Sequence, residues 1–261
     1  MTPELLLRHS DQATPWAAGC GLPVAEAYAR ALGVRQLRIA RGEQPRGFKV
    51  GFTNRTIWPR YGVFAPIWGT VWNTTLSFCE GEGELALAGT CQPRIEPECV
   101  FGLKATPPAR PSLDDLLACV EWIAPGFEIV QSHMPDWKFA AADTVADSGL
   151  HARLLVGPRI PVEQLPRDAA AFDAQLAAAS ITLYRGDERI DEGTGANVLD
   201  GPLHALSHFV SALRDYPGAP DLQPGDVVTT GTWTDAWPVH RGERWRAEFA
   251  APLAPLSVRF T

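Results

Sequence analysis

The pattern of apolar and polar residues changes from helical to strand-like near residue 45. Residues 3–9 and 23–42 carry apolar side chains at helical spacing, which predicts two helices at the N-terminus. From Gly47 onward the apolar runs are short and bounded by Gly and Pro, which is typical of strands joined by tight turns. We therefore predict a small helical N-terminal cap over residues 1–45 and a strand-rich main domain over residues 46–261.

Short runs throughout the main domain predict its strands: 47–52, 66–72, 83–89, 94–104, 127–131, 151–157, 181–184, 188–193, 226–231, 244–250 and 256–260. The runs ITLY and ERIDEG are joined across residues 185–188, which predicts a hairpin. Two helices interrupt this pattern. Ser112 and Asp115 begin a helix that we expect to run through LLACVEWI up to Pro125, and Pro202 begins the last helix.

Composition and charge exclude several classes of protein. The chain has 261 residues, of which 46% are hydrophobic and 20% charged, so it can bury a large core and is not disordered. A formal net charge of −7 excludes the dense positive field that nucleic acid binding requires. We expect no nucleic acid partner.

The cysteines and the N-terminus predict a compartment. Five cysteines without C-x-x-C spacing indicate reduced thiols rather than a disulfide framework or a zinc site. Charged residues interrupt the N-terminal apolar run at Glu4, Arg8 and Asp11, and no later stretch is apolar enough to span a bilayer. These features predict a cytoplasmic protein with no membrane partner.

Three glutamates predict a metal site. Glu96 and Glu98 are two residues apart in a predicted strand, so their carboxylates leave the same face. Glu128 lies between Phe127 and Ile129, where an unpaired carboxylate is costly to bury. Such an all-oxygen site suits Mg²⁺ or Mn²⁺ and leaves positions for a chelating substrate. The alternative is a solvated strand face with an unrelated, partly buried glutamate.

Six blocks along the chain carry a family resemblance. They are GFKVGFT (47–53), QPRIEPECVFGL (92–103), VEWIAPGFEIVQS (120–132), DWKFAAADTVADSG (136–149), GTGANVLDGPLHAL (193–206) and PGDVVTTG (224–231). In order and spacing, the chain from about Pro45 to Phe260 resembles the 2-keto-4-pentenoate hydratase and 4-oxalocrotonate decarboxylase branch of the fumarylacetoacetate hydrolase superfamily.

The resemblance implies a fold and a site. The fold would be α+β, a fumarylacetoacetate hydrolase-like β-roll of mixed, mostly antiparallel sheets with flanking helices. The metal ligands of the family would fall on Glu96, Glu98 and Glu128, and its lysine on Lys49. A partly desolvated lysine beside a divalent cation would exchange protons near neutral pH, with a pKa lowered toward roughly 7 to 8.

The chain also departs from the family pattern. Asn73 stands near the place of a family aspartate, His133 replaces an arginine expected near the substrate carboxylate, and Ser148 replaces an asparagine. The loop over residues 232–236 is more similar to that of decarboxylases. Lys138 and Asp143, in a matched block, are candidates to orient the substrate, the alternative being a structural ion pair.

These inferences converge on one expected function. The chain would be a divalent-metal-dependent lyase that acts on a 2-oxo-enoic acid or oxo-diacid through a metal-chelated enolate, in the catabolism of aromatic or related compounds. The missing aspartate favours decarboxylation over hydration, because loss of carbon dioxide needs no activated water. The alternatives are a hydrolase that cleaves a carbon–carbon bond of a diketo acid and a non-catalytic family member. We expect a homo-oligomer.

Overall fold

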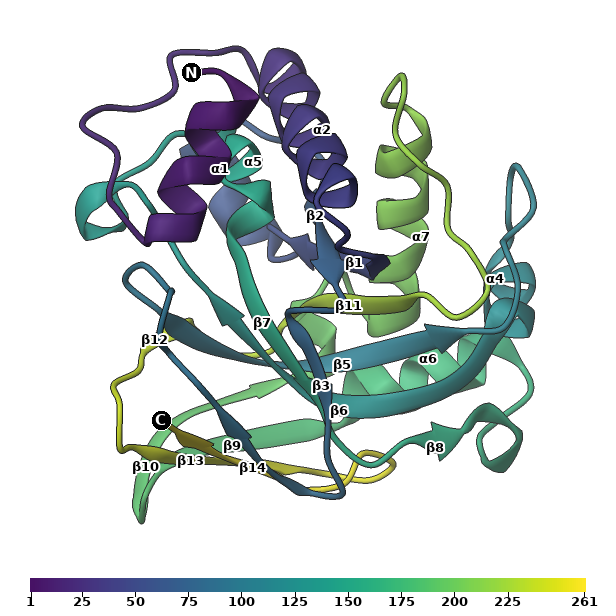
Figure 1. Ribbon diagram of the computed structural model, residues 1–261. Coiled ribbons are helices and arrows are strands. Elements are labelled where there is room, and N and C mark those ends of the chain that lie inside the picture. The colour runs from purple at the N-terminus through teal and green to yellow at the C-terminus, as the bar shows by residue number, and fades with distance from the viewer.

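Two β-sheets and a set of surrounding helices make up the structure, a computed structural model that describes residues 1–261 (Figure 1). The α-helices are α1 (Pro3–Gln12), α2 (Val24–Ala40), α3 (Trp58–Tyr61), α4 (Leu113–Cys119), α5 (Ala141–Ala146), α6 (Ala169–Ala178) and α7 (Pro202–Arg214). Short 3₁₀ turns include η2 (Pro135–Trp137) and η3 (Ser148–Leu150).

The larger sheet runs in the order β2-β1-β11-β5-β6-β7-β3, with β12 paired to β5 and β8 paired to β6. Its strands are β1 (Pro45–Gly51), β2 (Ile67–Trp72), β3 (Leu76–Phe78), β5 (Arg94–Leu103), β6 (Val120–Val130), β7 (His151–Val156), β8 (Ile160–Pro161), β11 (Val227–Thr232) and β12 (Trp237–Pro238). Within this larger sheet, only the pairs β1–β11 and β3–β7 are parallel.

The smaller sheet runs in the order β10-β9-β13-β14-β4 and lies below the larger one in Figure 1. Its strands are β4 (Glu82–Leu85), β9 (Ser180–Arg185), β10 (Glu188–Thr194), β13 (Arg244–Phe249) and β14 (Leu256–Phe260). Strands β9 and β10 form the predicted hairpin, with Gly186 in its turn at a φ of 58°. The prediction of mixed, mostly antiparallel sheets with flanking helices is confirmed.

The two predicted N-terminal helices are present as α1 and α2. The hydroxyl of Thr2 accepts a hydrogen bond from the backbone of Leu5 and caps α1. Helix α2 packs against α5, and its buried residues belong to the same apolar cluster as residues of both sheets. The core is therefore continuous across residue 45, and a separate cap over residues 1–45 stays a prediction.

The prediction for residues 116–131 was wrong in part. Helix α4 begins at the predicted capping box, but it ends at Cys119, and residues 120–130 form one long strand, β6. The strand is almost entirely buried and pairs with β5 along its length. An apolar run of this kind suits a buried helix or a buried strand equally well, and the pairing with β5 decides between them.

The two faces of the larger sheet differ in what they bury. The main apolar cluster includes residues that alternate along β5, such as Ile95, Cys99 and Phe101. A smaller cluster, which includes Val100 of β5, Ala124 of β6 and Val227 of β11, lies on the opposite face. Side chains of even-numbered residues on β5 and β6 therefore point to this second face, where the candidate site lies.

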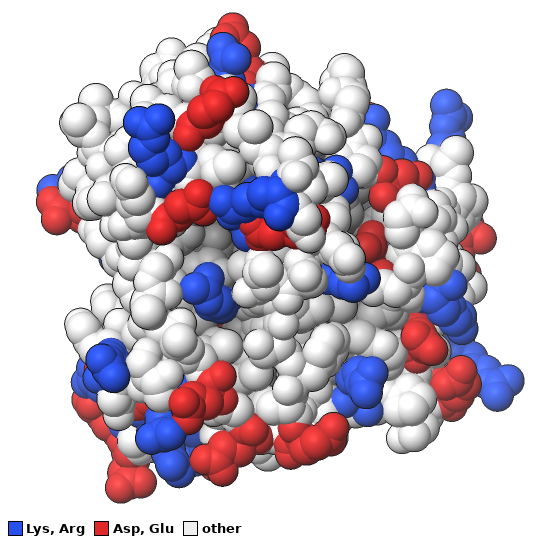
Figure 2. All heavy atoms as spheres, in the orientation of Figure 1, with Lys and Arg blue, Asp and Glu red and all other residues white.

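The outer surface agrees with the expectation from net charge. Figure 2 shows acidic and basic side chains intermixed on the visible face, with no broad area of positive charge. All five cysteines are free thiols, as predicted. None of the helices is both long and apolar enough to cross a membrane.

Candidate metal centre and substrate pocket

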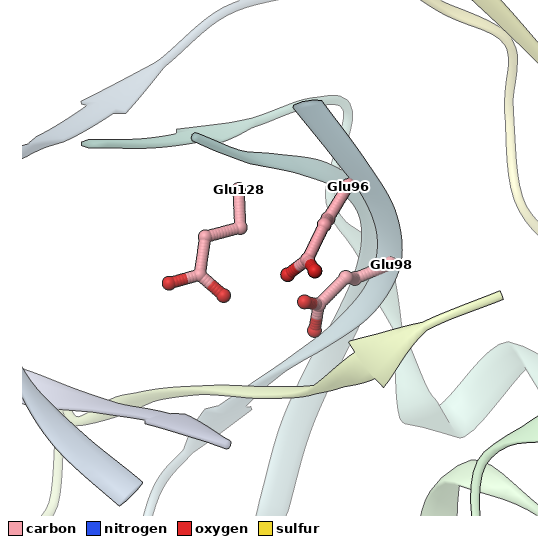
Figure 3. A group of neighbouring side chains, drawn as sticks. All are labelled: Glu96, Glu98 and Glu128. Carbon is pink, nitrogen blue, oxygen red and sulfur yellow. The ribbon is translucent and has the colours of Figure 1, made fainter. Parts of the chain in front are cut away.

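The register of β5 and β6 brings the three glutamates together. Glu96 on β5 pairs directly with Glu128 on β6, and Glu98 follows on the same face of β5. One carboxylate oxygen from each residue lies within 4.8 Å of the others. Figure 3 shows the three side chains converging. The predicted convergence is therefore present, and the alternative of an unrelated glutamate does not describe this structure.

Glu98 is completely buried, and backbone amides hold one half of its carboxylate. Its Oε2 accepts hydrogen bonds from the N–H groups of Thr230 (3.0 Å) and Gly231 (2.6 Å) at the end of β11. Its Oε1 is buried and has no hydrogen-bond partner. The two backbone amides thus fix the orientation of the carboxylate through Oε2, and Oε1 is left for a ligand.

Gly231 is needed for this contact. Its φ is 96°, in the left-handed region, and a Cβ at this position would lie 1.8 Å from Oγ1 of Thr53. Only glycine fits so closely against residue 53 while its amide points at Glu98.

Glu128 is also completely buried and has two different neighbours. Its Oε1 lies 3.0 Å from Nδ1 of His151, whose Nε2 lies 2.8 Å from Oγ1 of Thr75. Its Oε2 lies 3.6 Å from Nζ of Lys49 on β1 and has no hydrogen-bond partner. Lys49 is only 2% exposed. The buried ammonium group of Lys49, on a third strand, therefore lies beside the carboxylates.

Burial sets the protonation of the glutamates. It raises the pKa of Glu128 to about 8, and it raises the pKa of Glu98 well above its usual range, with further increases from the neighbouring carboxylates. The pKa of Glu96 is raised by burial too, against the opposing charge of Lys49. Three carboxylates so close together are costly when all are ionised and no cation binds them.

The pKa of Lys49 is raised in the protein without a metal. Burial acts to lower this pKa, but the charges of the three glutamates together act more strongly, so it is raised above its ordinary value. The lowered pKa expected beside a bound divalent cation stays a prediction.

A pocket of about 410 Å³ opens beside this cluster. Lys49 and Glu96 lie at its wall, together with residues 50–54, the segment 231–236, and side chains from α3 and the segment before α5. Its volume falls within the usual range of small-molecule sites, about 300–1,000 Å³.

The donor set fits a hard divalent cation. No other group of three Asp, Glu, His or Cys side chains brings its ligand atoms together in this way. Two of the carboxylate oxygens, Oε1 of Glu98 and Oε2 of Glu128, are buried without a hydrogen-bond partner. Carboxylate oxygens are the ligands that Mg²⁺ and Mn²⁺ prefer. A bound cation would satisfy those oxygens and offset the repulsion among the carboxylates.

Comparison with known proteins identifies the family. The family described as fumarylacetoacetate (FAA) hydrolase C-terminal matches residues 72–259. The chain belongs to the fumarylacetoacetate hydrolase family. Of the family, 2-hydroxyhexa-2,4-dienoate hydratase of Comamonas testosteroni is 30% identical over 92% of this chain and 87% of its own length. The 4-oxalocrotonate decarboxylase of a Pseudomonas species is 31% identical over 81% of this chain and 77% of its own length.

A solved structure supports the same fold. The 4-oxalocrotonate decarboxylase from Pseudomonas putida G7, complexed with magnesium and adipate, superposes with a TM-score of 0.87 at 23% identity, over 99% of this chain and 95% of that one. The predicted β-roll of the fumarylacetoacetate hydrolase family is confirmed.

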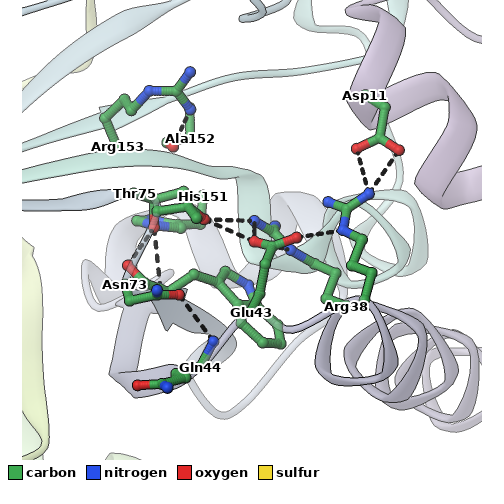
Figure 4. A network of polar contacts seen from close by, with 12 residues as sticks. Asp11, Arg38, Glu43, Gln44, Asn73, Thr75, His151, Ala152 and Arg153 are labelled. Carbon is green, nitrogen blue, oxygen red and sulfur yellow. Dashed lines mark hydrogen bonds and ion pairs between the residues drawn. The ribbon is translucent and has the colours of Figure 1, made fainter.

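Asn73 of this family member is not part of the pocket. It lies in the exposed turn after β2, where its Oδ1 accepts a hydrogen bond from the backbone N–H of Gln44 and its own N–H donates to the carbonyl of Gln44 (Figure 4). The turn is surrounded by a surface network that includes Glu43 and Arg38. Asn73 therefore lies outside the pocket lining, because the chain leaves the sheet at Trp72, and a catalytic role for this residue stays a prediction.

His133 is buried and does not line the pocket. Its Nδ1 lies 2.6 Å from Oδ1 of Asp147, its backbone N–H donates to Oδ2 of the same residue, and its ring stacks on Trp16. The carbonyl of His133 also accepts the N–H of Trp16. His133 thus joins the N-terminal segment to the body of the protein, and nothing places it near a substrate carboxylate.

Lys138 and Asp143 have structural contacts instead of pocket contacts. Lys138 is exposed and lies 3.4 Å from Asp136, an ion pair of the kind the sequence left open. Asp143 is buried and accepts N–H groups from Ala140, at the start of its own helix, and from Cys20 of the N-terminal segment. Neither lines the pocket. The contacts of both residues favour the structural alternative, and a role in orienting the substrate stays a prediction.

Two residues of the site went unnoticed in the sequence. His151 contacts Glu128 and Thr75 contacts His151, yet these two residues lie at the start of β7 and in the turn after β2, far from Glu128 in sequence. Burial lowers the pKa of His151 well below its usual range, so the ring is neutral. No local motif signals such a contact, which depends on the pairing of β6 with β7.

Proposed function

We propose that this protein is a divalent-metal-dependent lyase that acts on a 2-oxo-enoic acid or a related oxo-diacid, by hydration or decarboxylation. The observation that carries the proposal is the cluster of half-buried Glu96 with buried Glu98 and Glu128, beside Lys49 at the wall of a pocket. The names of the relatives support the reaction class, because they are hydratases and a decarboxylase that act on such acids.

The three glutamates would hold the cation, which we propose to be Mg²⁺ or Mn²⁺. A divalent cation at this place supplies positive charge to the carboxylate and keto oxygens of a 2-oxo acid and stabilises the enolate form of that acid. The amides of Thr230 and Gly231 fix the orientation of Glu98, and His151 fixes that of Glu128. Held in this way, the carboxylates need little rearrangement to bind a ligand.

Lys49 would carry the proton. Its Nζ lies at the pocket wall, and its raised pKa keeps it protonated in the protein alone, so it would give a proton to a carbon of the bound acid. Its ion pair with Glu128 keeps Nζ beside the cluster. Proton transfer at this atom is common to hydration and decarboxylation, and both reactions use the same residues.

Asn73 does not distinguish hydration from decarboxylation, since this residue lies outside the pocket. The segment 232–236, more similar to that of decarboxylases, does line the pocket. We propose, further, a homo-oligomeric protein located in the cytoplasm, as expected from the sequence. Size-exclusion chromatography with light scattering measures the first of these.

Turnover tests the main proposal. We expect one of 2-hydroxypenta-2,4-dienoate and 2-oxohex-3-enedioate to be consumed, with activity lost on chelation and restored by Mg²⁺. Glu98→Gln should weaken Mg²⁺ binding in calorimetry by about tenfold or more, because a charged ligand is removed. The matched control is Glu121→Gln, an exposed glutamate of the same strand as Glu128.

Three results would count against the proposal. Turnover that persists without a metal would contradict a metal-dependent lyase, and hydrolytic cleavage of a diketo acid would favour the hydrolase. Mg²⁺ binding without turnover of either acid would favour a non-catalytic family member.

A further inference from the structure

One wall of the pocket is built from aromatic rings in contact. Phe52 stacks on Tyr61 with ring centroids 4.9 Å apart, and Tyr61 stacks on Phe139 at 5.7 Å. Phe139 in turn contacts Trp137 at 5.9 Å. All four side chains line the pocket that contains Lys49 and Glu96. We call these four residues the aromatic wall.

The aromatic wall is held in place by unusual backbone geometry. Phe52 has a φ of 57° and Trp137 a φ of 58°, and such left-handed conformations cost about 1–3 kcal/mol each in residues other than glycine. The indole of Trp58 donates to the carbonyl of Phe52 at 2.6 Å, and that of Trp137 to the carbonyl of Gln92 at 3.0 Å. The fold therefore sustains strain at two of the four positions that present rings to the pocket.

The polar part of the pocket does not offer a clear site for a second carboxylate. Asp191, Glu192 and Asp235 line it, and Glu192 is paired with Arg189. Asp191 is held by the indole of Trp237 and the backbone N–H of Asp235. Arg60 is the one arginine among the lining residues, and its guanidinium lies 5.4 Å from the centre of the Tyr61 ring. Lys49, the other basic residue of the lining, is paired with Glu128, so the positive charge of Arg60 alone faces the two aspartates.

We infer that the substrate carries an aryl or other planar unsaturated tail, which lies against the aromatic wall while its 2-oxo acid end faces the glutamates. This inference rests on the proposed function and narrows its substrate class. Rings that contact one another leave flat faces and edges that a planar group can pack against, whereas a charged tail would lose hydration there and meet two aspartates. A pocket of about 410 Å³ leaves room for such a tail beyond the oxo acid.

Calorimetry with three ligands of different tails tests the inference. In the presence of Mg²⁺, we compare 2-oxo-4-phenylbut-3-enoate, 2-oxopent-3-enoate and 2-oxohex-3-enedioate, which share the 2-oxo-enoate end and carry phenyl, methyl and carboxylate-bearing tails. We expect the phenyl compound to bind about tenfold more tightly than the methyl compound, and the diacid to bind no more tightly than the methyl compound.

Two variants identify the wall as the cause. Tyr61→Ala and Phe139→Ala should each remove most of the preference for the phenyl tail and leave binding of the methyl compound within about twofold. If either variant fails to fold, Tyr61→Leu or Phe139→Leu keeps the volume and removes the ring. The matched control is Phe64→Ala, a phenylalanine that is 83% exposed and does not line the pocket.

The outcomes separate this inference from the proposed function. Equal affinity for phenyl and methyl tails, tighter binding of the diacid, or an equal effect of Phe64→Ala would overturn the inference and leave the lyase proposal standing. Absence of binding by all three acids in the presence of Mg²⁺ would overturn both. A phenyl preference that disappears in the wall variants alone would support the inference.

Discussion

Raising the pH from 6.5 to 8 should destabilise the protein when it is free of metal. Burial raises the pKa of Glu128 to about 8, from 4.5 in an exposed glutamate. Between these two values, the folded protein keeps a proton that the unfolded chain has lost. The free energy of unfolding therefore falls as the pH rises, until the folded carboxyl also loses its proton.

The size of the effect follows from the same linkage. One proton bound only in the folded state lowers the free energy of unfolding by at most about 1.4 kcal/mol for each pH unit, which gives about 2 kcal/mol over this range. Glu98, whose pKa is also raised, acts in the same direction. The pH range begins at 6.5 because of His151. Its pKa is lower in the folded protein than in the unfolded chain, so the stability that the neutral ring contributes is lost only as the pH falls below about 6.5.

Urea unfolding with a chelator present, at several pH values across this window, measures the effect. Glu128→Gln should flatten the dependence on pH, whereas Glu121→Gln should behave like the original protein. Excess Mg²⁺ should flatten or reverse the dependence, because bound carboxylates need no proton. Stability that is constant or rises with pH in the metal-free protein would refute the argument that burial dominates the cluster.

Further substitutions test other parts of the site. Lys49→Met should lower turnover by about a hundredfold or more while Mg²⁺ affinity, measured by calorimetry, changes little, and near-normal turnover would remove Lys49 from the mechanism. Gly231→Ala should reduce the free energy of unfolding by about 3 kcal/mol, and adding Thr53→Ala should recover part of that loss. An unchanged urea midpoint in Gly231→Ala would contradict the close contact between residues 231 and 53. Asn73→Asp should change the rates of hydration and decarboxylation by less than about twofold, and a selective gain in hydration would show that its turn reaches the substrate.

The carboxylate cluster was predictable because strand periodicity is local. The spacing of Glu96 and Glu98 is enough to put both carboxylates on one face. The place of Glu128 follows from the apolar residues on either side of it, which indicate burial, although only the pairing of β5 with β6 puts it opposite Glu96. Residue type and spacing thus identified the ligand candidates, and the pairing of strands determined their geometry.

Two of the candidates that lie outside the pocket, Asn73 and Lys138, stand where the chain leaves regular structure. Asn73 follows the last residue of β2, and a displacement of one residue there separates a strand face from an exposed turn. His133 and Asp143 bind the N-terminal segment, a contact between regions more than 100 residues apart that no local pattern contains. Lys138 lies in a turn whose preceding residues have left-handed backbone, so the strand-like alternation assumed for it does not apply.

Because Glu96 pairs directly with Glu128, the carboxylate cluster forms only when β5 and β6 are in the correct register. A slip of one residue between β5 and β6 would turn one carboxylate onto the opposite face of the sheet, among the apolar side chains of the main core. Misaligned molecules would then lack the full set of oxygen ligands and gain nothing from a divalent cation. A cation bound by this cluster would thus favour correctly aligned molecules during folding, a selection independent of any role in turnover.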